Sequence, residues 1–147
     1  MASPTAVSCG IEAKNFSKGK LVVLGRFLFA LIFLLGGPSH FSKQTIAYAA
    51  SQGVPLASIV VPLSGILGIA GGLSILLGYR AKLGAGLIVL FLVRTTLLMD
   101  RFWTMQYPLM AQMQMALFMK NVALIGGALF ISQFGAGPFS VDAWRTR

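Results

Sequence analysis

The sequence predicts an all-α integral membrane protein, a four-helix bundle with both termini cytoplasmic. Three observations lead to this fold class. Of the 147 residues, 56% are hydrophobic and only 10% are charged, whereas a typical soluble domain has about 25% charged residues. Four long apolar segments follow one another along the chain, and the basic residues lie mainly between them. This pattern is typical of membrane-spanning helices with short loops, so the lipid bilayer is the first expected partner.

Four segments are long enough, or nearly so, to cross a hydrocarbon core of about 30 Å, which requires about 20 apolar residues in a helix. They are Leu21–Phe41, Leu56–Gly78, Leu83–Met99 and Gln112–Phe134. We therefore expect one domain over residues 21–147, preceded by a polar, basic N-terminal segment over residues 1–20. The first segment is too long for the apolar core of a cleavable signal peptide. Gly36-Gly37-Pro38 is expected to end or distort its helix.

The distribution of basic residues predicts the orientation. With four spans, the N-terminus, the second loop and the C-terminus share one side of the membrane. That side holds Lys14, Lys18, Lys20, Arg80, Lys82, Arg145 and Arg147. The opposite side holds Lys43 and Arg101. The positive-inside rule places the richer side in the cytoplasm of a bacterial inner membrane or its equivalent, and it explains the net charge of +9 without a nucleic-acid partner.

Small residues indicate how the second span packs. Ser64, Gly68 and Gly72 recur every four residues, and such a row lets another helix backbone approach closely. We expect this row to pack inside the bundle. The alternative is a seam between the subunits of a homodimer.

Three basic residues lie inside the apolar segments, where a charge is costly. Arg26 is close to the cytoplasmic end of the first span, so its side chain is expected to reach the interface. Arg94 and Lys120 lie in the outer halves of the third and fourth spans. Together with His40, they predict a basic, partly buried site for a ligand with oxygen acceptors or negative charge.

The ligand of this outer site is expected to be a quinone or a small anion. Trp103, in the third loop, could stack on a quinone ring, although interfacial anchoring is the commoner role of such a residue. The structural alternative is that Arg94 pairs with Asp100 or with backbone carbonyls. Arg101 also flanks the outer end of the third span.

Several kinds of chemistry are excluded by what the chain lacks. It has one cysteine and one histidine, which cannot form a disulfide, a zinc cluster or a bis-histidine haem site within the chain. No catalytic constellation of residues is visible, so no catalytic residue is assigned and a non-catalytic subunit is favoured. Any redox carrier must then be diffusible or belong to a partner.

Three segments of the chain resemble the DoxX family of small four-helix membrane proteins. They read LGRFLFALIFLLGGPSHFS, GVPLASIVVPLSGILGIAGGLSILLGYRAKLGA and FMKNVALIGGALFISQFGAGPFSVD. Arg26, Lys120 and Asn121 match motif-like positions of the family, and this match adds Asn121 to the candidate ligand-binding residues. The chain departs from many DoxX relatives in the second span, where Gly68 or Ile69 stands in place of a glutamate.

The resemblance implies a function that the residues alone do not. It implies an accessory or structural subunit of a membrane redox or electron-transfer complex, working with other membrane subunits and lining a quinone or small-anion site. The alternative is a small anion carrier or channel that acts as a homo-oligomer. No covalently bound cofactor is expected in either case.

Overall fold

The computed structural model describes residues 4–100, 102–104 and 106–145, with side chains for 19–100, 102–103 and 106–145. Over these residues the chain is all α, as predicted. Its elements are α1 (Pro4–Gly36), η1 (Gly37–Phe41), α2 (Lys43–Ser51), α3 (Ala57–Leu77), α4 (Ala81–Met99), η2 (Phe102–Thr104), α5 (Pro108–Phe134) and α6 (Val141–Arg145). Arg101 and Arg147 lie outside the described residues.

Four of these helices are long and apolar enough to cross a membrane, which confirms the predicted integral membrane fold. The candidate spans are Gly19–Phe41, Ala57–Leu77, Ala81–Met99 and Pro108–Phe134. Each lies close to its predicted range, and the fourth begins earlier, at Pro108 instead of Gln112. Proline is favoured in the first turn of a helix because its fixed φ suits that turn and its missing N–H is not needed there.

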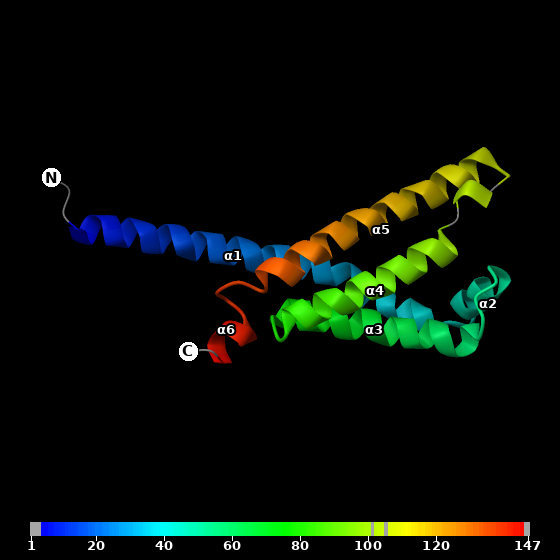
Figure 1. Ribbon diagram of the computed structural model, residues 1–147, viewed down its shortest axis with the longest axis horizontal. Coiled ribbons are helices and arrows are strands. Elements are labelled where there is room, and N and C mark those ends of the chain that lie inside the picture. Colours follow the sequence, from blue (N-terminus) through cyan, green and yellow to red (C-terminus); the bar gives the residue numbers. More distant parts are fainter. Residues whose placement is uncertain (1–3, 101, 105, 146–147) are drawn as a thin grey trace.

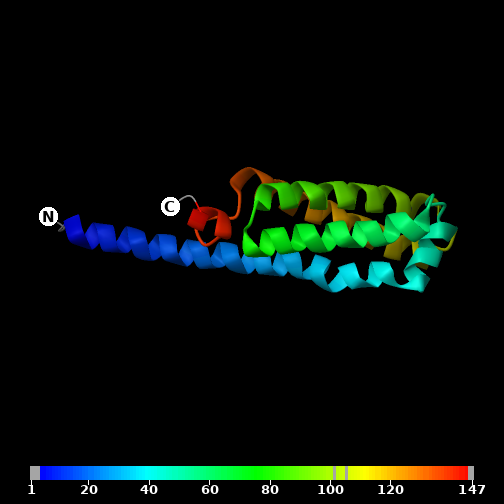
Figure 2. The same cartoon turned by 90° about the horizontal axis from the view of Figure 1, so that it is seen from below.

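The first helix behaves differently at its two ends. At its start, the helix continues without a break through the polar segment that precedes the span, and this part projects beyond the bundle (Figures 1 and 2). The sequence had not predicted a helix there. At its other end α1 stops at Gly36, and a 3-10 turn carrying Pro38 follows, as the Gly-Gly-Pro motif predicted.

The spans run in alternating directions, so α6 and the turn between α3 and α4 lie at the same end of the bundle as the projecting part of α1 (Figures 1 and 2). We call this the inner end, and the end that carries η1, α2 and η2 the outer end. Helix α3 packs against α1 and α4, and α4 packs against α5. Towards the outer end, α1 and α5 diverge (Figure 1).

Small residues bring the middle helices together. A Cβ atom at Gly71 would lie 3.1 Å from the backbone oxygen of Gly84 in α4. One at Gly72 would lie 3.2 Å from the Cβ of Phe33 in α1, and one at Gly68 would lie 3.9 Å from Phe91. The structure therefore places Gly68 and Gly72 inside the bundle and not on a seam between subunits.

The apolar core lies at mid-height of the bundle, where α1, α3, α4 and α5 meet. Its buried members are Phe33, Ile75, Ala85, Ile88, Leu92 and Ala128. A second buried cluster lies at the outer end, where α2 folds over the start of α3, and it contains Ala49, Val54, Ala57 and Val61. The bundle is thus packed by one apolar core in its middle and by a second cluster under α2 at the outer end.

Candidate functional site

A cavity of about 370 Å³ opens where α1 and α5 diverge, and we call it the outer cleft. Its base is apolar and includes Phe33, Phe91, Leu92 and Leu124. Its polar lining residues come from η1, α2, α4 and α5 and from the residue that follows α4: Ser39, His40, Thr45, Tyr48, Thr95, Asp100, Gln114, Lys120 and Asn121. The cleft therefore combines an apolar base with a concentration of hydrogen-bonding groups, which suits a ligand with a polar head.

A hydrogen-bonded pair of buried polar residues forms one wall of the outer cleft. Asp100 ends α4, and Asn121 lies on the inward face of α5; each side chain is only 7% exposed. The Asn121 amide Nδ2 donates to the Asp100 carboxylate oxygen at 2.7 Å. Because an unpaired polar group is costly in a buried position, this bond ties the two helices together at the outer end.

Opposing influences act on the pKa of the Asp100 carboxyl, and the net effect raises it. Burial raises the pKa of the Asp100 carboxyl above its ordinary value of 3.8, whereas the hydrogen bond from Asn121 and the positive charge of Lys120 lower that pKa. Burial is the largest of these effects. Lys120 is itself exposed on the cleft, so the cleft contains one basic and one acidic group close together.

Helix α2 is joined to α5 by a hydrogen bond between two residues that line the cleft. The Gln114 amide Nε2 donates to the Tyr48 hydroxyl at 3.2 Å. The other amide atom of Gln114, Oε1, is buried and has no hydrogen-bond partner among the described residues. Gln114 is thus held in position from one side and retains an unused acceptor.

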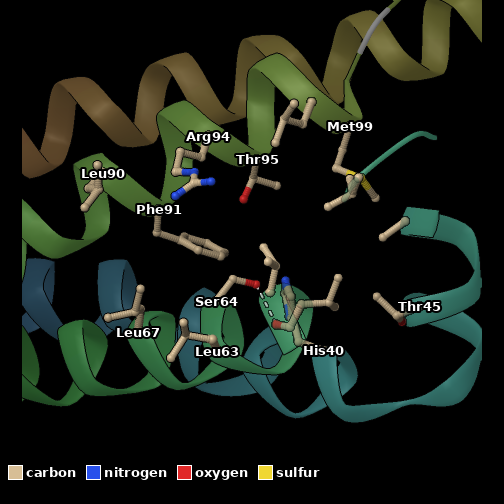
Figure 3. Close-up of a pocket in the computed structure, with 15 residues that line it drawn as sticks. His40, Thr45, Leu63, Ser64, Leu67, Leu90, Phe91, Arg94, Thr95 and Met99 are labelled. Atoms are coloured by element: carbon tan, nitrogen blue, oxygen red, sulfur yellow. Dashed lines mark hydrogen bonds between the residues drawn. The ribbon is translucent and has the colours of Figure 1, made fainter. Parts of the chain in front are cut away.

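His40 lies between the outer cleft and a second cavity. Its Nδ1 is 3.3 Å from the backbone oxygen of Gly36, and its ring meets Phe91 edge to face with centroids 5.7 Å apart. The second cavity, of about 140 Å³, lies between α3 and α4, and His40, Ser64 and Arg94 line it (Figure 3). We call this the α3–α4 cavity.

The predicted outer site is therefore divided. His40, Lys120 and Asn121 line the outer cleft, whereas Arg94 lines the α3–α4 cavity and not the cleft. The structural alternative, in which Arg94 pairs with Asp100, is not seen among the described residues: the Asp100 carboxylate accepts from Asn121 and lines the outer cleft, whereas Arg94 does not line it. Arg94 and Lys120 lie on different helices, and the rotation of each helix about its axis directs the two side chains into different cavities. The spacing of residues along the sequence does not reveal this rotation.

Trp103 lies in neither cavity. It packs edge to face against Phe102 and Phe118, with ring centroids 5.1 and 6.3 Å away, and 57% of its surface is exposed. This arrangement fits an interfacial anchor at the outer end and gives no stacking surface to the cleft.

Arg26 is buried near the inner end instead of reaching water. Only 5% of its surface is exposed, and its Nη2 donates to the backbone oxygen of Phe139 at 2.6 Å. Its Nε and Nη1 are buried without partners among the described residues. The expected extension to the interface is replaced by a contact with the segment between α5 and α6, which folds back over the inner end.

Comparison with known proteins identifies the family. The model of the SURF4 family matches residues 10–147. The chain belongs to the SURF4 family. It is also 30% identical over 129 residues to the inner membrane protein YqjF of Escherichia coli strain K12, covering 82% of this chain and 88% of that relative. Together with the four spans, this supports the predicted location in an inner membrane. No solved structure matches the chain.

The identification as a DoxX family member is therefore wrong, since the family model and the relative both point to SURF4 and YqjF. The physical reason lies in the features that suggested it. Gly-Gly pairs, a Gly-Pro helix end and a basic inner loop are needed by many small four-helix membrane bundles for close packing and orientation. Such features describe an architecture and do not distinguish one family from another.

The sequence interpretation missed part of the outer cleft. Tyr48 and Gln114 received no role, and Asp100 was considered only as a partner for Arg94. A signal was available for the missed acid, because Asp100 is one of only three acidic residues in the chain and an isolated acid next to a span is seldom without function. Nothing in the sequence indicated that Tyr48 and Gln114 would meet.

Proposed function

We propose that this protein is a non-catalytic binding protein of the membrane, and that its outer cleft holds the polar head of a neutral amphipathic molecule of the quinone class. The observation that carries the proposal is the buried Asp100–Asn121 pair beside Lys120 in the wall of a 370 Å³ cavity. Such a pair offers donors and an acceptor at fixed positions, at a depth where polar groups are otherwise costly.

The charges in the cleft favour a neutral head over a free anion. Lys120 supplies one positive charge, and the nearby Asp100 supplies a negative charge when it is ionised. A quinone carbonyl would accept hydrogen bonds from the Lys120 ammonium group or the Tyr48 hydroxyl. A quinol hydroxyl would instead donate to the unused Oε1 of Gln114.

The apolar surfaces of the cleft suit the rest of such a ligand. Phe33, Phe91 and Leu92 form the base, and Ile32 of α1 and Leu117 of α5 also line the cleft. An isoprenoid tail could pass between these apolar residues into the bilayer without crossing a polar region.

The alternative of an anion carrier is less well supported by the same geometry. A carrier needs a polar route across the membrane, whereas the buried core of Phe33, Ile88, Leu92 and Ala128 closes the bundle below the cleft. Electron transfer to a bound quinone would require a redox centre on another membrane subunit. The proposal therefore includes a partner that carries that centre, and an accessory role for this chain.

The test is binding of a short-tailed ubiquinone to the purified protein in phosphatidylcholine nanodiscs. Quinone retained after gel filtration is counted against empty nanodiscs. We expect saturable binding of about one quinone per chain, weakened about tenfold or more in the variants Asn121→Leu and Lys120→Gln. The first removes the amide that fixes the Asp100 carboxylate in the wall of the cleft, and the second removes the ammonium group that would donate to the quinone carbonyl.

The matched control is Lys43→Gln, which removes one positive charge from the exposed start of α2 at the same end of the bundle, outside both cavities. It should bind quinone like the wild type. Retention no greater than that of empty nanodiscs, or equal binding by Asn121→Leu and the wild type, would overturn the proposal.

A further inference from the structure

Arg94 is a charged residue within a membrane span that has no counter-ion among the residues whose side chains the structure describes. It lies in the outer half of α4 and is exposed on the α3–α4 cavity. Among the described residues it has no hydrogen-bond or ion-pair partner. An arginine in a span usually pairs with an acid or with backbone carbonyls, so its unpaired state needs an explanation.

The acidic residues of the chain are all placed elsewhere. There are only three, Glu12, Asp100 and Asp142. Glu12 belongs to the part of α1 before its span, and the Asp142 carboxylate at the inner end accepts hydrogen bonds from the backbone N–H groups of Arg80 and Ala81. Asp100 is bound by Asn121 and does not line the α3–α4 cavity. Neither acid whose side chain the structure describes is thus placed to pair with Arg94, which leaves it available to a counter-ion from outside the chain.

The walls of the cavity indicate the chemistry of the molecule that would carry the anionic group. They are mainly aliphatic and include Val60, Leu63, Leu67, Leu90 and Leu98. Arg94 projects from α4 into the space that Leu63, Ser64 and Leu67 border from α3 (Figure 3). The Ser64 hydroxyl donates to the backbone oxygen of Val61 at 2.7 Å, and the charge in the lining comes from Arg94.

The volume limits the size of the ligand. A cavity of about 140 Å³ is close to the roughly 150 Å³ that holds one benzene molecule in a protein interior. It accommodates a carboxylate and the first few methylene groups of one chain, and it is too small for the glycerol and two acyl chains of a phospholipid.

We propose that the α3–α4 cavity is a second binding site, which takes the carboxylate end of a single-chain amphiphile such as a long-chain fatty acid. The Arg94 guanidinium binds the carboxylate with two parallel N–H···O bonds. The chain then follows the groove of Leu63, Leu67 and Leu90 into the bilayer. Arg94 does not line the outer cleft, so this site is distinct from the quinone site, although the two cavities adjoin and share His40, Thr45, Phe91, Thr95 and Met99.

The test measures radiolabelled palmitate bound to the full-length protein in phosphatidylcholine nanodiscs, after subtraction of palmitate partitioned into empty nanodiscs. We expect one saturable site per chain. Arg94→Gln should weaken binding about tenfold or more, because a charge-assisted bidentate contact is lost. Leu67→Trp, which fills the groove and keeps the arginine, should weaken it as well, whereas Lys43→Gln should not.

The outcomes separate this proposal from that of the outer cleft. Methyl palmitate has no carboxylate and should not compete with palmitate, whereas phosphatidylglycerol should compete weakly because of its two chains. Equal binding of palmitate to wild type and Arg94→Gln, or equal competition by the methyl ester, would overturn the proposal. Circular dichroism and gel filtration of the same samples show whether the variants remain folded. Short-tailed ubiquinone, measured separately on them, shows whether the cleft proposal stands or fails independently.

Discussion

The hydrogen bond between Asn121 and Asp100 is expected to contribute measurably to the stability of the outer end. The substitution Asn121→Leu keeps a side chain of similar size in α5 but removes the donor to the carboxylate. The carboxylate is then left 7% exposed without that 2.7 Å bond. Lys120 still acts on it through space, so the loss is partial.

The magnitude follows from the burial and the charge of the pair. Hydrogen bonds to charged groups contribute about 1.5–3 kcal/mol in soluble proteins. Side-chain hydrogen bonds between membrane helices average about 0.6 kcal/mol and reach about 1.7 kcal/mol. Because this pair is short, buried and ionisable, we expect a loss of about 1.5 kcal/mol in the free energy of unfolding.

A double-mutant cycle isolates the pair from other effects of the substitutions. The variants are Asn121→Leu, Asp100→Leu and the double variant, each unfolded reversibly in mixed micelles and followed by circular dichroism. The double variant should lose less than the sum of the single variants, because it leaves no unpaired polar group behind. Additive losses, within about 0.5 kcal/mol, would refute the reasoning that the pair joins α4 to α5.

The same pair predicts a pH dependence with a definite sign. Burial raises the pKa of folded Asp100 above 3.8, so between its unfolded and folded pKa the folded state binds more protons. The contribution of Asp100 protonation to the free energy of unfolding is thus complete below the unfolded pKa, and it is lost as the pH rises through the folded pKa. Asn121→Leu should extend this loss to higher pH, and Asp100→Asn should abolish it. A rise in wild-type stability over this window that disappears in Asp100→Asn would contradict the assignment.

Three further substitutions test the packing and the inner end. Gly71→Ala should lower the free energy of unfolding by about 1–3 kcal/mol, because the new Cβ would lie 2.9 Å from Ile88; Gly86→Ala, with nothing within 4 Å, is the matched control and should be neutral in the same unfolding assay. Asp142→Ala should cost about 0.5–2 kcal/mol, since its carboxylate caps the start of α4. Arg26→Ala should speed proteolysis of residues 135–145, because the Phe139 carbonyl loses its contact; unchanged cleavage would show that α6 is held without it.

The agreement between the predicted and observed spans has a local physical cause. The bilayer requires long apolar helices because no water is present to satisfy backbone groups, so hydropathy alone locates them. Gly36-Gly37-Pro38 ends α1 for a reason that is equally local, since proline cannot continue the backbone hydrogen bonds. Because the spans alternate in direction, the turn between α3 and α4 and helix α6 both lie at the inner end of the bundle.

The family assignment failed because it rested on these same general features. Small residues, helix ends and basic loops are imposed by the membrane on many unrelated bundles. The comparison of the whole chain with known proteins, and not the motifs, established the SURF4 family.

The sequence by itself determined the four spans, the end of the first helix and the concentration of polar residues in the outer half of the bundle. Only the tertiary structure decided which of those residues meet. Lys120 acts on the charge of Asp100, and Arg94 faces a separate cavity. Both placements depend on how far each helix is rotated about its own axis. That rotation is set by contacts such as Gly71 on Gly84 and Gly72 on Phe33, which involve residues distant in the sequence and leave no local signal in it.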